Sequence, residues 1–302
     1  MSLLIPVLLH LRLHADAAAM PLLDVADAIS LLPVLSTLIV GTALTSQRPT
    51  HPVGWLFLVF GVVQVVPGAI DVVTEYLLAT RATLPGAVTV LAALSDISFV
   101  CWLTLLALIL LLTPGGELRG RLEQVTARLV VAACVVAMLG GMLRPYQGLF
   151  ADTGRVTNPL AVPTVQSLGK LLALSGVVVV HVGVLLAVVV VVRRYRASSP
   201  EMRPQLRWLR RAALPFLLLV ALAYVAAVLD IIWLLWLSAM GFAAILPIAV
   251  GLAIEREHLF DIEHLVSRGV SWLLPTATLV GTYIVVVFLS SRALGQRVGD
   301  SP

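Results

Sequence analysis

Apolar residues in this chain fall into long, nearly uninterrupted blocks that are separated by short polar segments. A helix needs about 20 mostly apolar residues to cross the hydrocarbon core of a bilayer, and the blocks have this length. They are too long and continuous to be barrel strands, and backbone groups in lipid must be hydrogen-bonded within the spanning structure. Eight blocks meet these criteria: residues 26–45, 53–77, 91–112, 125–143, 169–192, 212–229, 232–253 and 270–289.

This pattern predicts an all-α fold: a polytopic integral membrane helical bundle with about eight transmembrane helices. The helical membrane domain is expected to cover residues 26–289. An N-terminal segment, residues 1–25, precedes it, and a short polar tail, residues 290–302, follows it. The loops are too short to form a separate soluble catalytic domain.

The stretch from residue 212 to residue 253 holds two of these blocks with almost no polar segment between them. One helix of this length would extend for about 63 Å, roughly twice the thickness of the bilayer core. We therefore expect the chain to fold back near residues 229–232, with Asp230 marking the turn. Trp233 and Trp236 suit the interfacial aromatic belt that would lie next to such a turn.

Composition supports a membrane protein, because 60% of the 302 residues are hydrophobic and only 12% are charged. The mean hydropathy is +1.04. Disordered chains have few apolar residues and many charges, and soluble domains have about 25% charged residues, so both classes fit poorly. The net charge of +4 indicates membrane topology and contact with lipid headgroups rather than nucleic-acid binding.

The basic residues also predict an orientation. With the N-terminus outside, thirteen of the twenty basic residues lie on the inner side and seven on the outer side. The positive-inside rule therefore favours a plasma-membrane protein with both termini outside. Seven of the thirteen come from one inner loop and its flanks: Arg193, Arg194, Arg196, Arg203, Arg207, Arg210 and Arg211. We expect them to contact lipid headgroups or a partner protein, and the alternative is that they only anchor the topology.

Ionisable and amide side chains within the spans are the candidates for ligand binding, because such groups are costly in lipid and usually face the bundle interior. These residues are Gln64, Asp71, Asp96 and His181. Asp71 and Asp96, together with Glu75 and Asp230, would lie on the outer side and could line an acidic pocket for a cation, a proton or a small polar ligand. The alternative is that Asp71, Glu75 and Asp230 lie in the wet interface and only end helices.

No motif of an enzyme is found. The chain has no phosphate-binding loop of the Gly-x-x-x-x-Gly-Lys-Ser/Thr type, no Gly-x-Gly-x-x-Gly fingerprint and no Gly-x-Ser-x-Gly elbow. We therefore expect no catalytic residues, no cofactor and no metal site. The two cysteines, Cys101 and Cys134, lie inside apolar blocks and are expected to be buried free thiols.

Small residues at four-residue spacing, namely Ala133, Ala137 and Gly141, mark one face of the predicted helix over residues 125–143. Small side chains let the backbones of membrane helices approach closely. This face could therefore pack on another helix of the chain or on a second subunit, which leaves a homodimer open.

Several short segments resemble the N-terminal multi-pass membrane region of actinobacterial sensor histidine kinases. Residues 51–56 (HPVGWL) are similar to their Asn-Pro-Ile-Gly-Trp-Leu segment, and residues 113–118 (TPGGEL) are similar to their Phe-Pro-Asp-Gly-Arg-Leu loop. The same order continues with residues 158–160 (NPL), 203–209 (RPQLRWL), 259–264 (LFDIEH) and 267–268 (SR).

The resemblance implies a sensory, signal-transducing membrane module without a catalytic domain of its own. The kinases continue into a phosphoacceptor histidine and an ATP-binding domain, whose motifs are missing from this chain. Such a module would signal through a cytoplasmic or membrane partner, such as a kinase. Two alternatives remain open: a small transporter or permease that uses the ionisable residues within the spans, and a truncated, non-functional kinase fragment.

Overall fold

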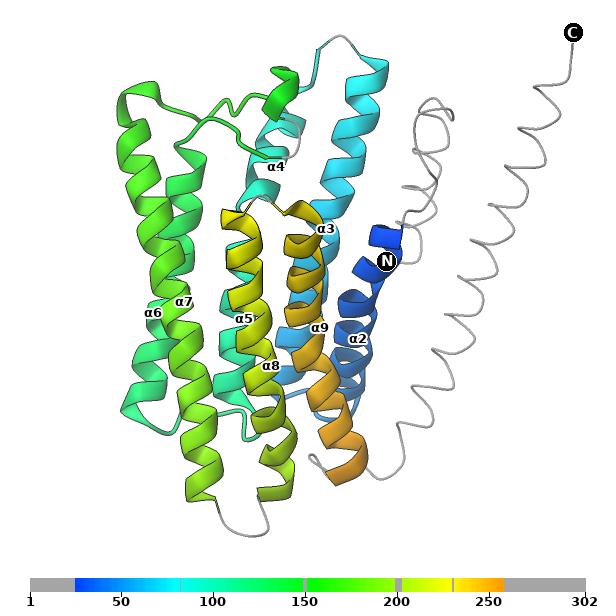
Figure 1. Cartoon of the computed structure of the whole chain (residues 1–302), viewed down its shortest axis with the longest axis vertical. Helices are drawn as coiled ribbons and strands as arrows, with labels where there is room; N and C mark the ends of the chain where they lie inside the picture. The colour runs from blue at the N-terminus through cyan, green and yellow to red at the C-terminus, as the bar shows by residue number, and fades with distance from the viewer. Residues whose placement is uncertain (1–24, 82, 149–150, 199–202, 230, 258–302) are drawn as a thin grey trace, which may run out of the picture. The chain divides into compact units, whose positions relative to one another are not determined.

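The computed structural model describes residues 25–81, 83–148, 151–198, 203–229 and 231–257, which all belong to one compact unit. This part of the chain is all-α (Figure 1). Its eight α-helices are α2 (Val25–Gln47), α3 (Pro52–Thr80), α4 (Gly86–Asp96), α5 (Phe99–Leu112), α6 (Arg121–Met142), α7 (Gln166–Ala197), α8 (Arg203–Val228) and α9 (Ile232–Glu257). Two short 3-10 helices, η1 (Ala151–Thr153) and η2 (Pro163–Val165), lie between α6 and α7.

Five of these helices, α3, α6, α7, α8 and α9, are long and apolar enough to cross a membrane. The pair α4 and α5 adds a sixth span if the two helices cross together. The apolar part of α2, Leu32–Gln47, is shorter than a full span. The described residues therefore form a multi-pass membrane protein with five or six spans, and eight transmembrane helices are not confirmed. The predicted block at residues 270–289 lies outside the described residues.

The block predicted as one helix over residues 91–112 is divided into two helices, and this bent pair, which is either a broken span or a re-entrant loop, is called the broken span below. α4 ends at Asp96, α5 begins at Phe99, and the two helices are bent by 47°. At the break, the Ser98 N–H donates to the carbonyl of Ser95 and the Cys101 N–H to the carbonyl of Ser98. These short-range bonds replace the i to i−4 pattern of an α-helix, and the serine and aspartate side chains there favour non-helical backbone.

The stretch from residue 212 to residue 253 contains parts of two helices, because α8 ends at Val228 and α9 begins at Ile232. The two helices pack along each other, as do α6 and α7 (Figure 1). α9 also packs on α2, which packs on α3, and α5 packs on both α3 and α7. The core of this bundle is formed by residues such as Phe57, Phe60 and Leu106, whose side chains are fully buried.

The long helix α7 shows an arrangement that suits lipid rather than water. Its buried face holds mainly small residues and valines, including Gly169, Ala173, Gly176, Gly183 and Ala187. Its exposed face is a stripe of larger apolar side chains: Leu171, Leu174, Val178, Val182, Leu185 and Val189. A water-soluble helix buries its large apolar residues, whereas a membrane helix packs small residues against its neighbours and exposes large ones to lipid.

The small-residue face predicted on α6 packs against other helices of the same chain. A Cβ atom added at Gly176 of α7 would lie 2.6 Å from the carbonyl oxygen of Ala133 and 2.7 Å from the Cβ of Ala137. Gly141 instead packs against Ile97, at the break between α4 and α5, where an added Cβ would lie 2.5 Å from Cγ2 of Ile97. We call the contact of Gly176 with Ala133 and Ala137 the glycine seam.

Candidate functional site

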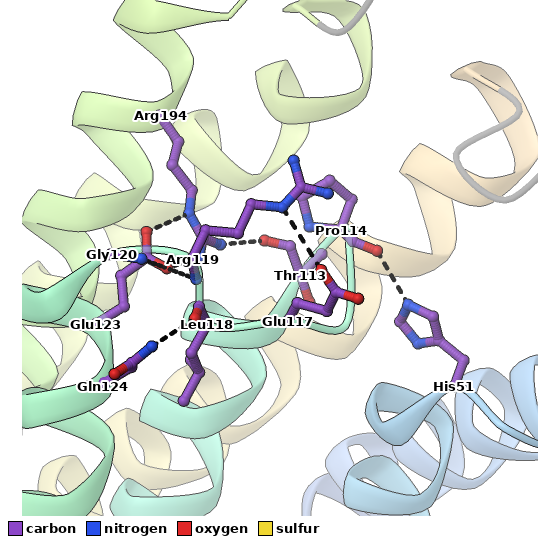
Figure 2. Close-up of polar contacts among 10 residues, drawn as sticks. All are labelled: His51, Thr113, Pro114, Glu117, Leu118, Arg119, Gly120, Glu123, Gln124 and Arg194. Carbon is purple, nitrogen blue, oxygen red and sulfur yellow. Dashed lines mark hydrogen bonds and ion pairs between the residues drawn. The ribbon is translucent and has the colours of Figure 1, made fainter.

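At one end of the bundle, the lower end in Figure 1, the side chain of Arg194 contacts Glu123 and the backbone of Thr113 (Figure 2). We call this group of three residues the polar tie. Arg194 Nε lies 2.9 Å from Glu123 Oε1, and its Nη2 lies 2.6 Å from Glu123 Oε2. Its Nη1 donates to the carbonyl of Thr113 over 2.9 Å. The last turn of α7 is thereby bound to the first turn of α6 and to the end of α5.

Glu123 is held in place by the backbone as well. Its Oε2 accepts hydrogen bonds from the N–H groups of Arg119 at 2.8 Å and Gly120 at 3.3 Å (Figure 2). These residues immediately precede α6, and the N-terminus of a helix carries a partial positive charge that favours a carboxylate. The Glu123 and Arg194 side chains are only 12% and 20% exposed, so water screens the pair weakly.

His51 connects a third segment to the same end. Its Nε2 lies 3.1 Å from the carbonyl oxygen of Pro114, which makes a hydrogen bond between the α2–α3 loop and the α5–α6 loop (Figure 2). Gly116 has φ +75, and a Cβ there would lie 3.0 Å from His51 Nε2, so only glycine allows this approach without strain. Burial lowers the pKa of His51, and the nearby Arg48 lowers it further, although the Pro114 bond opposes them.

A polar cleft of about 510 Å³ opens beside His51. It lies between the α2–α3 loop and the α5–α6 loop, the two segments that the His51–Pro114 bond connects. The residues that line it are Gln47, Arg48, Pro49, Thr50, His51, Pro52, Gly115, Gly116 and Glu117. These residues include parts of two of the segments used for the sensor-kinase resemblance, residues 51–56 and 113–118.

The predicted contact arginines lie on α7 and α8 at this same end. Arg193 and Arg196 are exposed, whereas Arg194 belongs to the polar tie. The Arg210 guanidinium lies 4.2 Å from the ring centre of Tyr195, which brings α8 against α7, and Arg211 lies 5.5 Å from the ring of Trp208. Arg207 is half-buried, and the side chain of Arg203 is outside the described part of the structure.

Gln64 is the most buried of the predicted ligand-binding residues. It is buried, and its Nε2 donates to Thr37 Oγ1 of α2 and to the carbonyl of Phe60, both at 3.3 Å. Its Oε1 atom has no hydrogen-bond partner among the described residues. Gln64 therefore joins α2 to α3.

Asp71 and Asp96 lie near each other beside the broken span. Asp71 Oδ1 is 3.4 Å from the hydroxyl of Ser95 in α4, and Glu75 and Asp96 are charged neighbours of Asp71. Asp96 accepts a hydrogen bond from the backbone N–H of Gln147 and lies close to the Arg144 guanidinium. The charge of these acidic groups is therefore partly offset by the Arg144 guanidinium, one backbone N–H and the Ser95 hydroxyl. Residue 230, which was predicted to lie with them, is outside the described residues.

His181 has different neighbours. Its ring packs edge-on against the ring of Tyr224 in α8, with the ring centres 4.9 Å apart. The Tyr224 hydroxyl is hydrogen-bonded to His181 Nε2, and His181 Nδ1 lies 2.6 Å from the carbonyl of Val177. The structure therefore groups Asp71 with Asp96, whereas Gln64 contacts α2 and His181 contacts α8.

The sequence reasoning missed two residues that fix the loop between α6 and α7. Asn158 is buried, and its Nδ2 donates to the carbonyls of Met142 and Arg144, both at 2.8 Å, where α6 ends. Arg155 donates to the carbonyls of Leu78, at 2.7 Å, and Arg81, so the same loop is bound to the end of α3. The Asn158-Pro159-Leu160 motif drew attention to Asn158 in the sequence but did not predict which carbonyl groups it contacts.

Both cysteines are free, as expected, and they lie next to each other. Cys101 Sγ is 3.7 Å from Cys134 Sγ. Cys134 is buried and Cys101 is half-buried. Within the described ranges, no group of three or more histidine, cysteine, aspartate or glutamate side chains has a geometry suited to a metal ion.

Comparisons with known proteins do not assign the chain to a family: no family model, no curated protein and no solved structure matches it. The fold and the composition define the class, a helical multi-pass membrane protein in contact with the lipid bilayer.

Proposed function

We propose that this protein is a sensory membrane module. A change in the arrangement of its spans is passed to a signalling partner, and the protein itself catalyses no reaction. The observation that carries the proposal is the polar tie together with the His51–Pro114 bond. They connect the start of α3, the α5–α6 loop, the start of α6 and the end of α7. A sensor needs its separate spans to be coupled at the end where the partner binds, and these contacts supply such coupling.

The transmission step follows from the geometry of the tie. A movement of the last turns of α7, beyond the glycine seam, moves the Arg194 guanidinium, which is bonded to Glu123 and to the Thr113 carbonyl. The α5–α6 loop then moves with it, and the exposed arginines that flank the tie present the change to an acidic partner surface or to lipid headgroups. Two of the segments similar to sensor kinases, residues 51–56 and 113–118, meet at this end.

Photocrosslinking in living cells tests the proposal. A photoreactive amino acid replaces Glu117 or Arg196, which are exposed at the end that holds the tie. The control position is Thr164, an exposed residue of η2, which directly precedes the other end of α7. We expect one discrete adduct with a kinase or another signalling protein from Glu117 and Arg196, and none from Thr164. The same adduct from all three positions, or no adduct above background, would contradict the proposal.

The broken span supports a second function, that of a small transporter for a cation or protons. Discontinuous membrane helices commonly form ion sites in transporters, and the break between α4 and α5 adjoins Asp71 and Asp96. The test is flux into proteoliposomes. Flux that Asp96→Asn abolishes and that Glu117→Gln leaves intact would favour transport, whereas the absence of flux for cations and protons would exclude this function.

A further inference from the structure

Sulfur atoms gather at one point between α5 and α6. The chain has two cysteines and six methionines, and three of these side chains meet there. Cys101 Sγ lies 3.7 Å from Cys134 Sγ and 3.5 Å from Met138 Sδ. Cys134 and Met138 are four residues apart on α6 and so lie on the same face of that helix, whereas Cys101 comes from α5.

The separations between these atoms suit a metal ion. A first-row metal lies about 2.3 Å from a thiolate sulfur, so the sulfurs of a three-coordinate site are separated by about 4 Å. The two observed S–S separations, 3.7 and 3.5 Å, need only small side-chain rotations to reach this value. Thiolate and thioether sulfur are soft ligands, which suit monovalent copper, zinc and iron–sulfur clusters. Zinc takes four ligands from cysteine, histidine and carboxylate side chains, so a set of three donors that includes a methionine favours monovalent copper.

The position of the sulfur atoms in the fold also indicates a binding site. Cys101 lies in the first turn of α5, directly after the break that bends the span by 47°. Non-helical backbone within a membrane span is tolerated where it is buried in protein or lines a site, and discontinuous helices form the ion sites of many carriers. Gly141, one turn beyond Ala137 on α6, gives the break the space it needs at Ile97.

We propose that Cys101, Cys134 and Met138 form a binding site for monovalent copper within the membrane region. On binding, both thiols release their protons to solvent and bind Cu⁺ as thiolates, and the thioether is the third sulfur donor. The complex then has a net charge of −1 shared over the copper and its sulfur ligands, and neither copper nor sulfur changes its oxidation state. This inference does not rest on the proposed sensory function.

Competition for copper tests the site. The full chain, reduced and reconstituted in lipid nanodiscs without oxygen, is titrated with Cu⁺ against the chelator bathocuproine disulfonate. We expect one tightly held copper per chain, loss of this copper in the Cys101→Ser/Cys134→Ser double variant, and about tenfold weaker binding in Met138→Leu. Met142→Leu, which changes another methionine on α6, should bind copper as the wild type does. X-ray absorption should show only sulfur neighbours, at about 2.3 Å.

Met138→Leu keeps the volume of the side chain, so it tests the ligand without removing packing. Three results would overturn the proposal: no copper bound by the reduced wild type, equally tight binding by the double variant, or equal weakening by Met138→Leu and Met142→Leu. Mass spectrometry after thiol alkylation gives a further check. If the reduced chain holds no copper, and a Cys101–Cys134 disulfide forms only when copper is added in air, where dioxygen is the oxidant, the pair is a redox couple and the copper site is wrong.

Discussion

Helices α6 and α7 meet in two different ways along their length. In the glycine seam, Gly176 lies against Ala133 and Ala137, and none of these three residues has a polar side chain. At the polar tie, the same two helices are joined by the Arg194–Glu123 ion pair. The seam depends on shape alone, whereas the tie depends on charge and hydrogen bonds.

The glycine seam and the polar tie therefore have different roles: the seam fixes how the two helices pack, whereas the tie can transmit a movement between them. A glycine seam allows little adjustment, because a single added carbon meets the backbone of the facing helix. An ion pair between two long side chains can lengthen or rotate without separating the helices. We therefore expect substitutions in the seam to reduce stability most, and substitutions in the tie to act on the loops that it connects.

The largest effect is expected in the seam. Gly176→Ala would place Cβ 2.6 Å from the carbonyl oxygen of Ala133, so the helices must separate. We expect the free energy of unfolding to fall by about 1–3 kcal/mol, as for other overpacked interiors, in a detergent unfolding titration. Gly68→Ala is the matched control on α3, because nothing lies within 4 Å of its Cβ position. Equal losses in both variants would mean that close packing does not determine the effect.

A smaller effect is expected in the tie. Arg194→Lys keeps the charge but cannot maintain three separately directed hydrogen bonds to Glu123 and Thr113. We expect a loss of about 1 kcal/mol in the same unfolding titration. Arg193→Lys changes the neighbouring exposed residue and should leave stability within about 0.5 kcal/mol of the wild type. If the two variants behave alike, the tie contributes no stability to the bundle.

The smallest effect concerns pH. Burial lowers the pKa of His51 below its ordinary value of 6.5, so the unfolded chain binds the proton more readily than the folded one. The stability that neutral His51 contributes is therefore present above pH 6.5 and is lost as pH falls through the lowered pKa. His51→Gln can still donate to Pro114 but cannot titrate. Unfolding measured between pH 7.5 and 5.5 should show a shallower decline for this variant, and equal declines would contradict the assignment.

Hydrophobic blocks predicted the helical membrane class, and small-residue spacing marked Ala133 and Ala137 as a face that could pack closely on another helix of the chain or on a second subunit. Block length follows bilayer thickness, and small residues at four-residue spacing lie on one helix face, so both are local properties of the sequence. The break after Asp96 was not predicted, because an apolar count over residues 91–112 does not register a local change in hydrogen bonding. The polar residues around the break were the only signal in the sequence that could have predicted it.

The candidate sites were harder to predict because they depend on contacts between distant residues. Glu123 and Arg194 are 71 positions apart, and no periodicity connects them. Glu123 lies at the start of a predicted span and Arg194 lies in a basic loop, so neither residue stood out as part of a site. For the same reason no partner could be predicted for Gln64 or His181, which contact α2 and α8 rather than a shared pocket.

The central claim is that lipid covers the large apolar residues of α7 while its small residues face the bundle. Spin labels at Leu174 and Val178, on a chain with Ser at both cysteine positions, test this claim in reconstituted vesicles. These two residues are 60% and 53% exposed. We expect high collision rates with oxygen, which dissolves in lipid, and low rates with a water-soluble nickel chelate, whereas a label at Arg196 should show the reverse. High nickel accessibility at Leu174 and Val178 would contradict the account.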